Sequence, residues 1–195
     1  MNSKTLIYKN ENQVKGPLLV ELKSFDDNRG YFYEKWNQKN FDKLIGRPIA
    51  FVQDNISKSA KGVIRGLHYQ VLPRSQAKLV SCIYGEIFDV AVDIRKNSPT
   101  FGSWVGALLN ESNKSQLWIP DGFAHGFLSL SNQAIVHYKT TDFWSAEHER
   151  SIAWDDENIN IEWPMDLLEG KDTLVSEKDK RAMNFINIKD NDLFL

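Results

Sequence analysis

The sequence predicts an all-β protein, a jelly-roll barrel with a few short peripheral helices, and three observations lead to this fold class. Between about residues 18 and 163, short runs rich in β-branched and aromatic residues alternate with turn residues. The turns recur at the spacing expected of a barrel or a sandwich. Only a short segment, residues 39–46, has the period of an amphipathic helix.

The expected strands follow one another with turns between them. In chain order they are residues 48–55, 62–70, 78–84, 86–94, 101–109, 115–120, 126–131, 134–144 and 151–156. The third and fourth flank a Tyr84-Gly85-Glu86 turn, which predicts a β-hairpin. In the fourth strand one face is wholly apolar, whereas the other alternates apolar residues with Asp89 and Asp93.

We expect one domain over residues 1–195, with a barrel core at about residues 18–164 and a polar tail at 165–195. No internal repeat, low-complexity tract or linker divides the chain. Residues 176–186 have the pattern of a capped short helix or of a tail packed on the barrel.

Composition narrows the class of protein. The chain is 42% hydrophobic and 26% charged, with a formal net charge of -2 and a pI of about 6.1. No overall basic field favours nucleic acid as a partner, and no apolar run is long enough to span a bilayer. Cys82 has no second cysteine to pair with, and the first residues lack the apolar run of a secretion signal. We therefore expect a cytoplasmic protein that binds neither nucleic acid nor membranes.

Four histidines are candidates for chemistry, and His68 is the strongest of them. His148 lies in a charged loop, where a solvated side chain is the simplest interpretation. Because side chains alternate along a strand, His137 and Tyr138 point to opposite faces, and at most one of them faces a barrel interior. His125 follows a Pro-x-Gly turn, and the sequence leaves open whether it is structural or part of a site.

His68 lies in the expected strand GVIRGLHYQ, residues 62–70, among polar side chains and glycines, and glycines tolerate unusual backbone conformations. Strict alternation places Arg65 on the face opposite to His68. A β-bulge at Gly66 would bring both side chains to one face, which is a common reason for a glycine inside a strand. We therefore predict a bulge at Gly66 that lets Arg65 and His68 serve one pocket.

Two segments resemble the metal-binding motifs of cupins but lack some of the ligands. The segment GVIRGLH, ending at His68, is similar to the start of the first motif, and PDGFAH, ending at His125, is similar to the second. Gln70 replaces the second histidine of the first motif, and Gln76 and Lys78 stand where its glutamate is expected. Glutamine is a poor replacement for imidazole on a transition metal, and an ammonium group repels a cation. The sequence therefore predicts a cupin cavity without a metal ion.

Such a cavity can carry out proton transfer. A neutral histidine such as His68 is a candidate general base, and Lys78 or Arg65 could stabilise the oxyanion of an enolate. An epimerase also needs an acid on the opposite face of its substrate. Tyr138 is the natural candidate, although a lone strand tyrosine is more often a core or rim aromatic.

Asp179 has two interpretations that the sequence leaves open. Ser176 and Asp179 have the spacing of a helix cap, which is the simpler interpretation. In the other, Asp179 reaches the far nitrogen of His68 and fixes its tautomer.

Seven segments, in the same order, resemble the signatures of the dTDP-4-dehydrorhamnose 3,5-epimerase family. They are FDDNRGYFYE, FVQDNISKS, GVIRGLHYQ, KLVSCIYGEIFDVAVDIRKNSPTFGSWVG, NKSQLWIPDGFAHGF, YKTTDFW and WDDENINIEWP. The likeness extends from about Ser24 to Asp179. It implies a metal-free cupin barrel that needs no cofactor and works as a homodimer with an early N-terminal strand exchanged between subunits.

The resemblance also implies a reaction and a site. The substrate would be dTDP-4-dehydro-6-deoxy-D-glucose, inverted at C3 and C5 to give dTDP-4-dehydro-L-rhamnose in dTDP-L-rhamnose biosynthesis. By position, the base would be His68, its partner Asp179, the acid Tyr138 and the group near the enolate oxygen Lys78. Residues expected to bind the nucleotide sugar are Arg29, Phe32, Glu34, Gln53, Asn55, Arg65, Gln70, His125, Phe143, Glu149 and Lys178. Arginine forks suit a diphosphate, and phenylalanine rings suit the face of thymine.

The chain departs from the common family pattern at two places. Residues 142–144, Asp-Phe-Trp, stand where a pair of tyrosines is frequent, so the number of epimerised centres stays open. Two alternatives therefore remain, a monofunctional 3- or 5-epimerase of a related nucleotide 4-ketosugar and a non-catalytic sugar-binding cupin. The last residues, 183–195, are outside the shared pattern and have no expected function.

Overall fold

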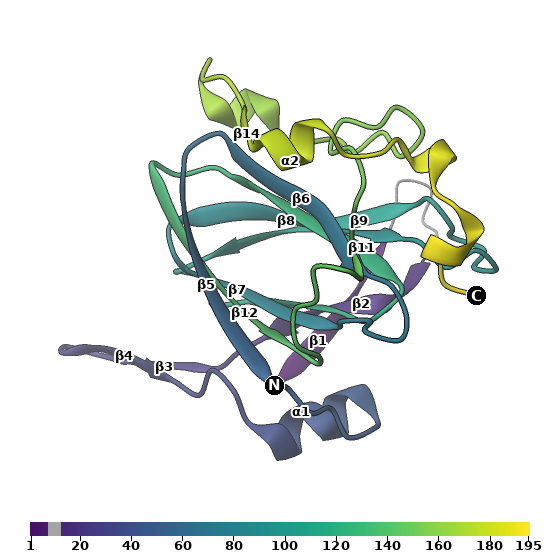
Figure 1. Cartoon of the computed structure of the whole chain (residues 1–195). Coiled ribbons are helices and arrows are strands. Elements are labelled where there is room, and N and C mark those ends of the chain that lie inside the picture. The colour runs from purple at the N-terminus through teal and green to yellow at the C-terminus, as the bar shows by residue number, and fades with distance from the viewer. Residues whose placement is uncertain (8–12) are drawn as a thin grey trace.

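The computed structural model describes residues 1–7 and 13–195, and most of its strands form two sheets that pack face to face (Figure 1). The first sheet has the order β1 (Asn2–Ile7), β2 (Gln13–Glu21), β10 (Gln116–Ile119), β7 (Lys78–Tyr84), β12 (Gln133–Thr140) and β5 (Gln53–Ala60). The second has the order β13 (Glu149–Ser151), β6 (Val63–Gln70), β11 (Phe123–Ser129), β8 (Glu86–Asp93) and β9 (Trp104–Asn110), and β14 (Leu174–Val175) pairs with β6. The predicted all-β jelly-roll is confirmed.

The peripheral helices agree with the sequence pattern. α1 (Gln38–Ile45) begins after Asn37, whose side chain accepts a hydrogen bond from the backbone N–H of Asn40. α2 (Glu177–Lys180) begins after Ser176 in the same way. Short 3-10 helices lie at Met165–Leu168, Phe185–Asn187 and Asp190–Asp192. Among the described residues, no helix is long and apolar enough to cross a membrane.

The predicted hairpin at residues 78–94 is wrong. β7 pairs with β10 and β12 in the first sheet, whereas β8 pairs with β9 and β11 in the second. At Gly85, where φ is 74°, the chain crosses from one sheet to the other. The apolar face of β8 joins the outer core of the second sheet, so its mixed face, with Asp89 and Asp93, points to the space between the sheets.

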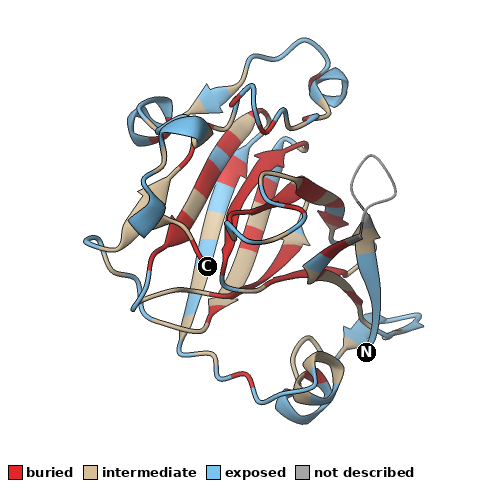
Figure 2. Cartoon of the chain, turned by 90° about the vertical axis from the view of Figure 1, so that its right-hand side faces the viewer, coloured by how far each residue is buried: buried red, intermediate tan, exposed pale blue. Residues whose placement is uncertain are grey.

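Three apolar clusters hold the layers together, and buried residues run along the strands of the barrel (Figure 2). The cluster between the sheets joins Val80 and Val136 of the first sheet to Ala91 of the second. A cluster that includes Phe194 covers the outer face of the second sheet, and one that includes Phe41 of α1 covers the outer face of the first. The barrel is therefore closed on both sides by short peripheral elements.

The C-terminal tail returns to the barrel. Phe194 is 9% exposed, its backbone N–H donates to the carbonyl oxygen of Ile94, and its own carbonyl accepts from Lys96. The side chain of Arg150 donates from Nε to Oδ1 of Asp192 at 2.8 Å. The tail thus holds β13 and the segment that follows β8 to one another.

β3 (Ser24–Asp27) and β4 (Gly30–Tyr33) form a separate hairpin that projects away from the barrel (Figure 1). Its aromatic side chains lie open to solvent, with Phe25 55%, Tyr31 57% and Phe32 70% exposed. Exposed aromatic surface of this kind is typical of an interaction surface.

Some strand boundaries differ from the prediction. β5 begins at Gln53 rather than at residue 48, because Ile49 and Phe51 pack into the cluster under α1. β11 begins at Phe123 and so includes His125, which the sequence had placed just after a turn. β1 and the first part of β2 lie ahead of the predicted start of the barrel at residue 18.

Candidate active site

A cavity of about 630 Å³ lies between the two sheets and the segment of residues 173–180. Its polar lining gathers side chains from β6, β7, β11, β12 and α2, and apolar neighbours such as Val63 and Phe127 complete it. The polar residues that had been predicted for the site and that line this cavity are Arg65, His68, Lys78, His125, Tyr138, Lys178 and Asp179.

His68 and Asp179 form a close pair at this cavity. Nε2 of His68 lies 2.6 Å from Oδ1 of Asp179, which is 4% exposed. The backbone N–H of Asp179 also donates to Oγ of Ser176 at 3.1 Å, so both interpretations of Asp179 describe the structure. Because the Nε2 proton points to the carboxylate, Nδ1 carries the lone pair of a neutral ring.

The ionisation of Asp179 follows from its contacts. Burial raises the pKa of this carboxyl group. The hydrogen bond and charge of His68, together with the hydrogen bonds from Ser176 and Gly66, lower the pKa by more than burial raises it. The net pKa is below the usual range of an aspartate, so the group is a carboxylate at neutral pH.

The predicted bulge at Gly66 is confirmed. His125 lies opposite His68 and Phe127 lies opposite Arg65, so β6 has one residue more than β11 between these pairs. Gly66 has a φ of 126°, and a Cβ there would lie 2.5 Å from Cα of Gly126. The bulge turns Arg65 and His68 toward the same cavity, as strict alternation would not.

Lys78 brings a positive charge to the cavity from the other sheet. Its Nζ donates to the backbone carbonyl oxygen of His68 at 3.1 Å, and the side chain is buried. Burial lowers the pKa of Lys78 to about 8, although Asp89 and Glu149 act to raise it. The group is therefore an ammonium ion at neutral pH, with its affinity for the proton reduced.

Tyr138 lies on β12 of the first sheet, whereas His68 lies on β6 of the second. Burial raises the pKa of Tyr138, and the charge of Arg65 partly offsets this. Its phenol is thus protonated at neutral pH and can act as a proton donor. His137 points away from the cavity toward Lys35 and Asp54, as the alternation predicted.

Asp89 is a residue of this region that the sequence analysis did not assign to the site. It is wholly buried on β8, and its Oδ1 lies 2.7 Å from Nε2 of His125. The available signal was a carboxylate with apolar neighbours on both sides of it along the strand, because such a charge needs a partner in the interior.

The hairpin residues expected to bind substrate lie outside this cavity. Arg29 sits at the tip between β3 and β4 and pairs with Asp27 at 2.6 Å, with 85% of its side chain exposed. Phe32 is exposed on β4, and Glu34 accepts a hydrogen bond from the side chain of Asn37 at the start of α1. None of these three is among the residues that line the cavity in the described chain.

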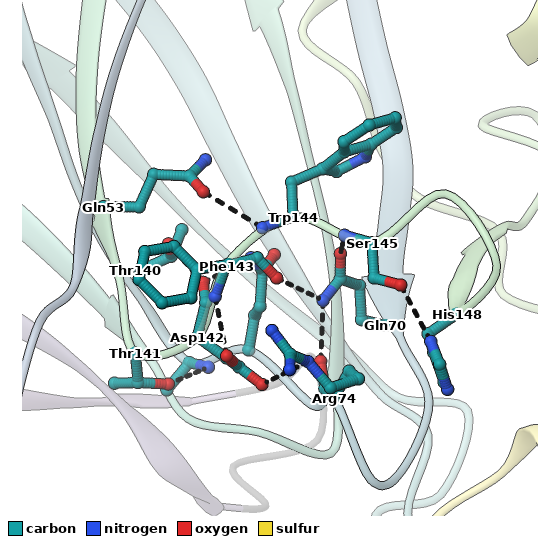
Figure 3. Close-up of polar contacts among 12 residues, drawn as sticks. Gln53, Gln70, Arg74, Thr140, Thr141, Asp142, Phe143, Trp144, Ser145 and His148 are labelled. Carbon is teal, nitrogen blue, oxygen red and sulfur yellow. Dashed lines mark hydrogen bonds and ion pairs between the residues drawn. The ribbon is translucent and has the colours of Figure 1, made fainter.

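Gln53, Gln70 and Phe143 are not among the residues that line the cavity, and they belong to one hydrogen-bonded cluster (Figure 3). The side-chain amide of Gln70 donates to the carbonyl oxygens of Arg74 at 2.6 Å and Phe143 at 3.2 Å, and its oxygen accepts from the N–H of Ser145 at 2.7 Å. Gln53 accepts from the backbone N–H of residue 144 and donates to Asn55. These amides fix the loop of residues 142–145 through contacts with its backbone.

Lys178, which lines the cavity, forms an ion pair of 2.5 Å with Glu149, which is not among the lining residues. Glu149 lies on β13 opposite Gln70, and Lys178 belongs to α2 beside Asp179. His148 is not simply solvated, since its Nδ1 lies 2.8 Å from Oγ of Ser145. Within the described ranges, no three His, Cys, Asp or Glu side chains are grouped to hold a metal ion.

Around one cavity lie a histidine held by a carboxylate, a phenol on the opposite sheet and a buried ammonium group, which are chemically able to serve as a base, an acid and a cation. Fold and site therefore define a cupin-type enzyme of acid–base chemistry. A family model described as dTDP-4-dehydrorhamnose 3,5-epimerase matches residues 11–187. The chain belongs to this family and is an isomerase.

Individual relatives agree with this assignment. A dTDP-4-dehydrorhamnose 3,5-epimerase of Shigella flexneri is 54% identical over 175 residues, which cover 90% of this chain and 94% of the relative. A crystal structure of RmlC from Legionella pneumophila, in complex with dTDP-4-keto-L-rhamnose, has a TM-score of 0.90 and 44% identity, over 99% of this chain and 98% of that one. ChmJ, a 3'-monoepimerase from Streptomyces bikiniensis in complex with dTDP-quinovose, has a TM-score of 0.81 and 29% identity, over 88% of this chain and 84% of that one.

Proposed function

We propose that this protein epimerises dTDP-4-dehydro-6-deoxy-D-glucose at C3 and C5 to dTDP-4-dehydro-L-rhamnose, a step of dTDP-L-rhamnose biosynthesis. The observation that carries the proposal is the position of His68 and Tyr138 on opposite sheets across one cavity, with Lys78 between the sheets. Inversion of a carbon centre needs a base on one face and an acid on the other, and this arrangement supports His68 and Tyr138 in these two roles.

The reaction begins when Nδ1 of His68 removes the proton from a carbon next to the C4 ketone. The electron pair of the C–H bond moves into the ring and the ketone oxygen becomes an enolate, which the Lys78 ammonium group stabilises. Tyr138 then gives its proton to the opposite face of the same carbon, and the ketone is restored. Asp179 stabilises the imidazolium of His68 that forms in the first step.

The nucleotide is held by the remaining charged and aromatic residues. Arg65 and Lys178 at the cavity suit the diphosphate, and Phe143 suits the face of thymine. We place Arg29, Phe32 and Glu34 of a second subunit in the same site, because the hairpin that carries them leaves its own barrel. The active form is then a homodimer with an exchanged early strand, and its location is the cytoplasm.

The direct test is incubation with the dTDP-4-dehydro-6-deoxy sugar in deuterated water, followed by NMR at C3 and C5. We expect deuterium at both centres with the wild type and at neither with His68→Ala. Label at only one centre would select the monofunctional epimerase, which Phe143 and Trp144 in place of tyrosines and the similarity to a 3'-monoepimerase make the second candidate. If the folded wild type incorporated no label, the non-catalytic sugar-binding cupin would be the remaining hypothesis.

The shared site has its own test, in which two variants complement one another. Arg29→Ala and His68→Ala are each expected to lose most activity, but co-expressed chains form hybrid dimers in which one site retains both native residues. We expect kcat/KM of the mixture to exceed the sum of the two variants. A mixture no more active than that sum, at a demonstrated hybrid fraction, would contradict strand exchange.

A further inference from the structure

Lys35 and His137 form a contact outside the candidate active site, at the base of the β3–β4 hairpin. Lys35 lies two residues after the end of β4, and its Nζ donates a hydrogen bond to Nδ1 of His137 on β12. The side chain of His137 is 16% exposed, and its backbone carbonyl accepts from Oγ of Ser81 on β7 at 3.1 Å. The hairpin is therefore tied to an inner strand of the first sheet, between β7 and β5.

Asp54 and Lys139 complete a cluster around this contact. Oδ1 of Asp54 on β5 lies 3.7 Å from Nε2 of His137, and both carboxylate oxygens accept from Nζ of Lys139, at 2.8 and 3.0 Å. The Lys139 ammonium group lies 5.9 Å from the ring centre of Trp36, and a cation and an aromatic ring attract one another at this distance. Since Trp36 follows Lys35 in the chain, the cluster holds the segment between the hairpin and α1 at two adjacent residues.

The cluster lies on the reverse side of two strands that carry candidate site residues. Side chains alternate along a strand, so His137 and the cavity residue Tyr138 point to opposite faces of β12. On β5, Asp54 likewise points away from its neighbours Gln53 and Asn55, whose side chains bond to one another. The hairpin is thus fixed to the outer face of the strands whose inner face presents Tyr138 and Asn55, which lie opposite one another.

Only a neutral His137 fits this arrangement. An ammonium group has no acceptor, so Nδ1 of His137 must accept, and the proton of the neutral ring is on Nε2 toward Asp54. A protonated ring would offer Lys35 no acceptor and would add a third positive charge to those of Lys35 and Lys139. Burial lowers the pKa of His137, Lys35 and Lys139 lower it as well, and Asp54 acts against them. Among the described residues, these are the charged groups that face His137, and β7 presents the uncharged Ser81.

We propose that Lys35 and His137 are positioning residues that fix the direction in which the β3–β4 hairpin leaves the barrel, and that protonation of His137 releases the hairpin. The inference rests on the proposed function, in which Arg29 and Phe32 of this hairpin complete the site of a second subunit. Neither positioning residue touches a reacting atom. Both act by holding the hairpin where its side chains can meet the substrate.

The pH dependence has a definite sign. The anchored hairpin requires a neutral ring, so it binds fewer protons at His137 than the released hairpin does. The anchor is complete above the ordinary imidazole pKa of about 6.5 and is lost progressively as the pH falls below it. Burial lowers the pKa of Lys35 to about 8, so the ammonium donor is present at neutral pH.

The test measures amide hydrogen exchange of residues 24–33 in the full-length protein at about pH 7.5 and about pH 5, corrected for the intrinsic effect of pH on exchange. We expect wild-type protection to fall about tenfold in acid, the effect of one charge-assisted hydrogen bond. In His137→Asn, Oδ1 replaces the Nδ1 acceptor and does not titrate, so protection stays equal at both pH values. In Lys35→Met, protection is low at both.

His148→Asn is the matched control. His148 also has a hydrogen-bonded Nδ1, which lies 2.8 Å from Oγ of Ser145, but it lies in the loop before β13. This variant should lose hairpin protection in acid as the wild type does. Wild-type protection that is independent of pH, or a His137→Asn variant that still loses protection in acid, would overturn the proposal. A Lys35→Met variant as protected as the wild type at about pH 7.5 would overturn it too.

Steady-state kinetics at about pH 7.5 connect the anchor to the site. Because the hairpin binds substrate and carries no acid or base, Lys35→Met is expected to raise KM and to retain kcat. An unchanged KM in this variant, with its hairpin released, would show that the anchor does not serve the site. Exchange is measured without substrate, so a wild type that releases its hairpin in acid but epimerises nothing would reject the proposed function alone.

Discussion

Gly66 controls the approach of two strands at the base of the cavity. A Cβ at this position would meet backbone atoms of Gly126 and His125 at 2.5 and 2.7 Å, and the φ of 126° disfavours any L-residue. Neither of the two strand backbones can move without disturbing the pairing register, and this register directs Arg65 and His68 toward one cavity.

Gly66→Ala is therefore expected to lower the free energy of unfolding by about 3 kcal/mol, through strain and a close backbone contact. Gly46→Ala is the matched control, because Gly46 also has a positive φ, 80°, but meets nothing within 4 Å. That change should cost only about 1 kcal/mol. Urea unfolding measures both, and equal losses would show that the close contact at Gly66 has no special weight.

Single residues divide into those that the sequence can predict and those that it cannot. The bulge was predictable, because a glycine between an arginine and a histidine breaks the alternation of a strand. Asp89 was visible as a carboxylate between apolar residues of its strand, but its partner His125 lies 36 residues away and no local pattern connects them. Gln70 was expected to contact the substrate. Its side-chain amide instead forms hydrogen bonds with a loop 73–75 residues further along the chain, which no local pattern indicates.

At the scale of the elements, the prediction of a hairpin at Gly85 was wrong. The residues of a turn are a local signal, whereas the sheet that each strand joins depends on distant parts of the chain. A glycine with positive φ serves equally for a chain that returns within one sheet and for one that crosses to the other. The corner is fixed by a distant segment, since the N–H of Glu86 donates to Oγ of Ser131 and a Cβ at Gly85 would lie 2.1 Å from the carbonyl oxygen of Gln133. α1 and α2 were predictable because their caps are encoded within a few residues.

The C-terminal tail is an element whose packing supports a stability prediction. Phe194→Ala is expected to lower the free energy of unfolding by about 3 kcal/mol, because it empties a place in the outer core of the second sheet. Leu195→Ala, one residue further and 93% exposed in the wild type, should change it by less than about 0.5 kcal/mol. Chemical unfolding of the two variants measures the difference, and an unaffected Phe194→Ala would mean that the tail is only loosely held.

At the scale of the whole molecule, buried carboxylates make the free energy of unfolding depend on pH in the acid range. Burial raises the pKa of Asp93, but Arg95, Ser98 and Thr100 donate to it and bring the net pKa below the usual range. Asp179 behaves in the same way. The unfolded chain therefore binds more protons than the folded one just below the usual aspartate value of about 3.9, and stability is lost as the pH falls through this range.

We expect the free energy of unfolding to be constant for these groups above about pH 5 and to decline steadily toward pH 3. Asp93→Asn should lose about 2 kcal/mol at pH 7 and show a shallower decline, because one of the responsible groups is absent. Urea titrations at several pH values measure the slope. An unchanged slope in the variant would assign the acid sensitivity to other groups.

Because His68 and Tyr138 lie on different sheets, the distance between the sheets limits which sugar rings can contact both side chains. Packed sheets stand about 10 Å apart, so side chains that reach inward from each sheet contact a bound sugar ring from its two sides. The hydrophobic residues that keep the sheets apart, remote from the chemistry, thereby take part in choosing which carbon skeletons can be inverted.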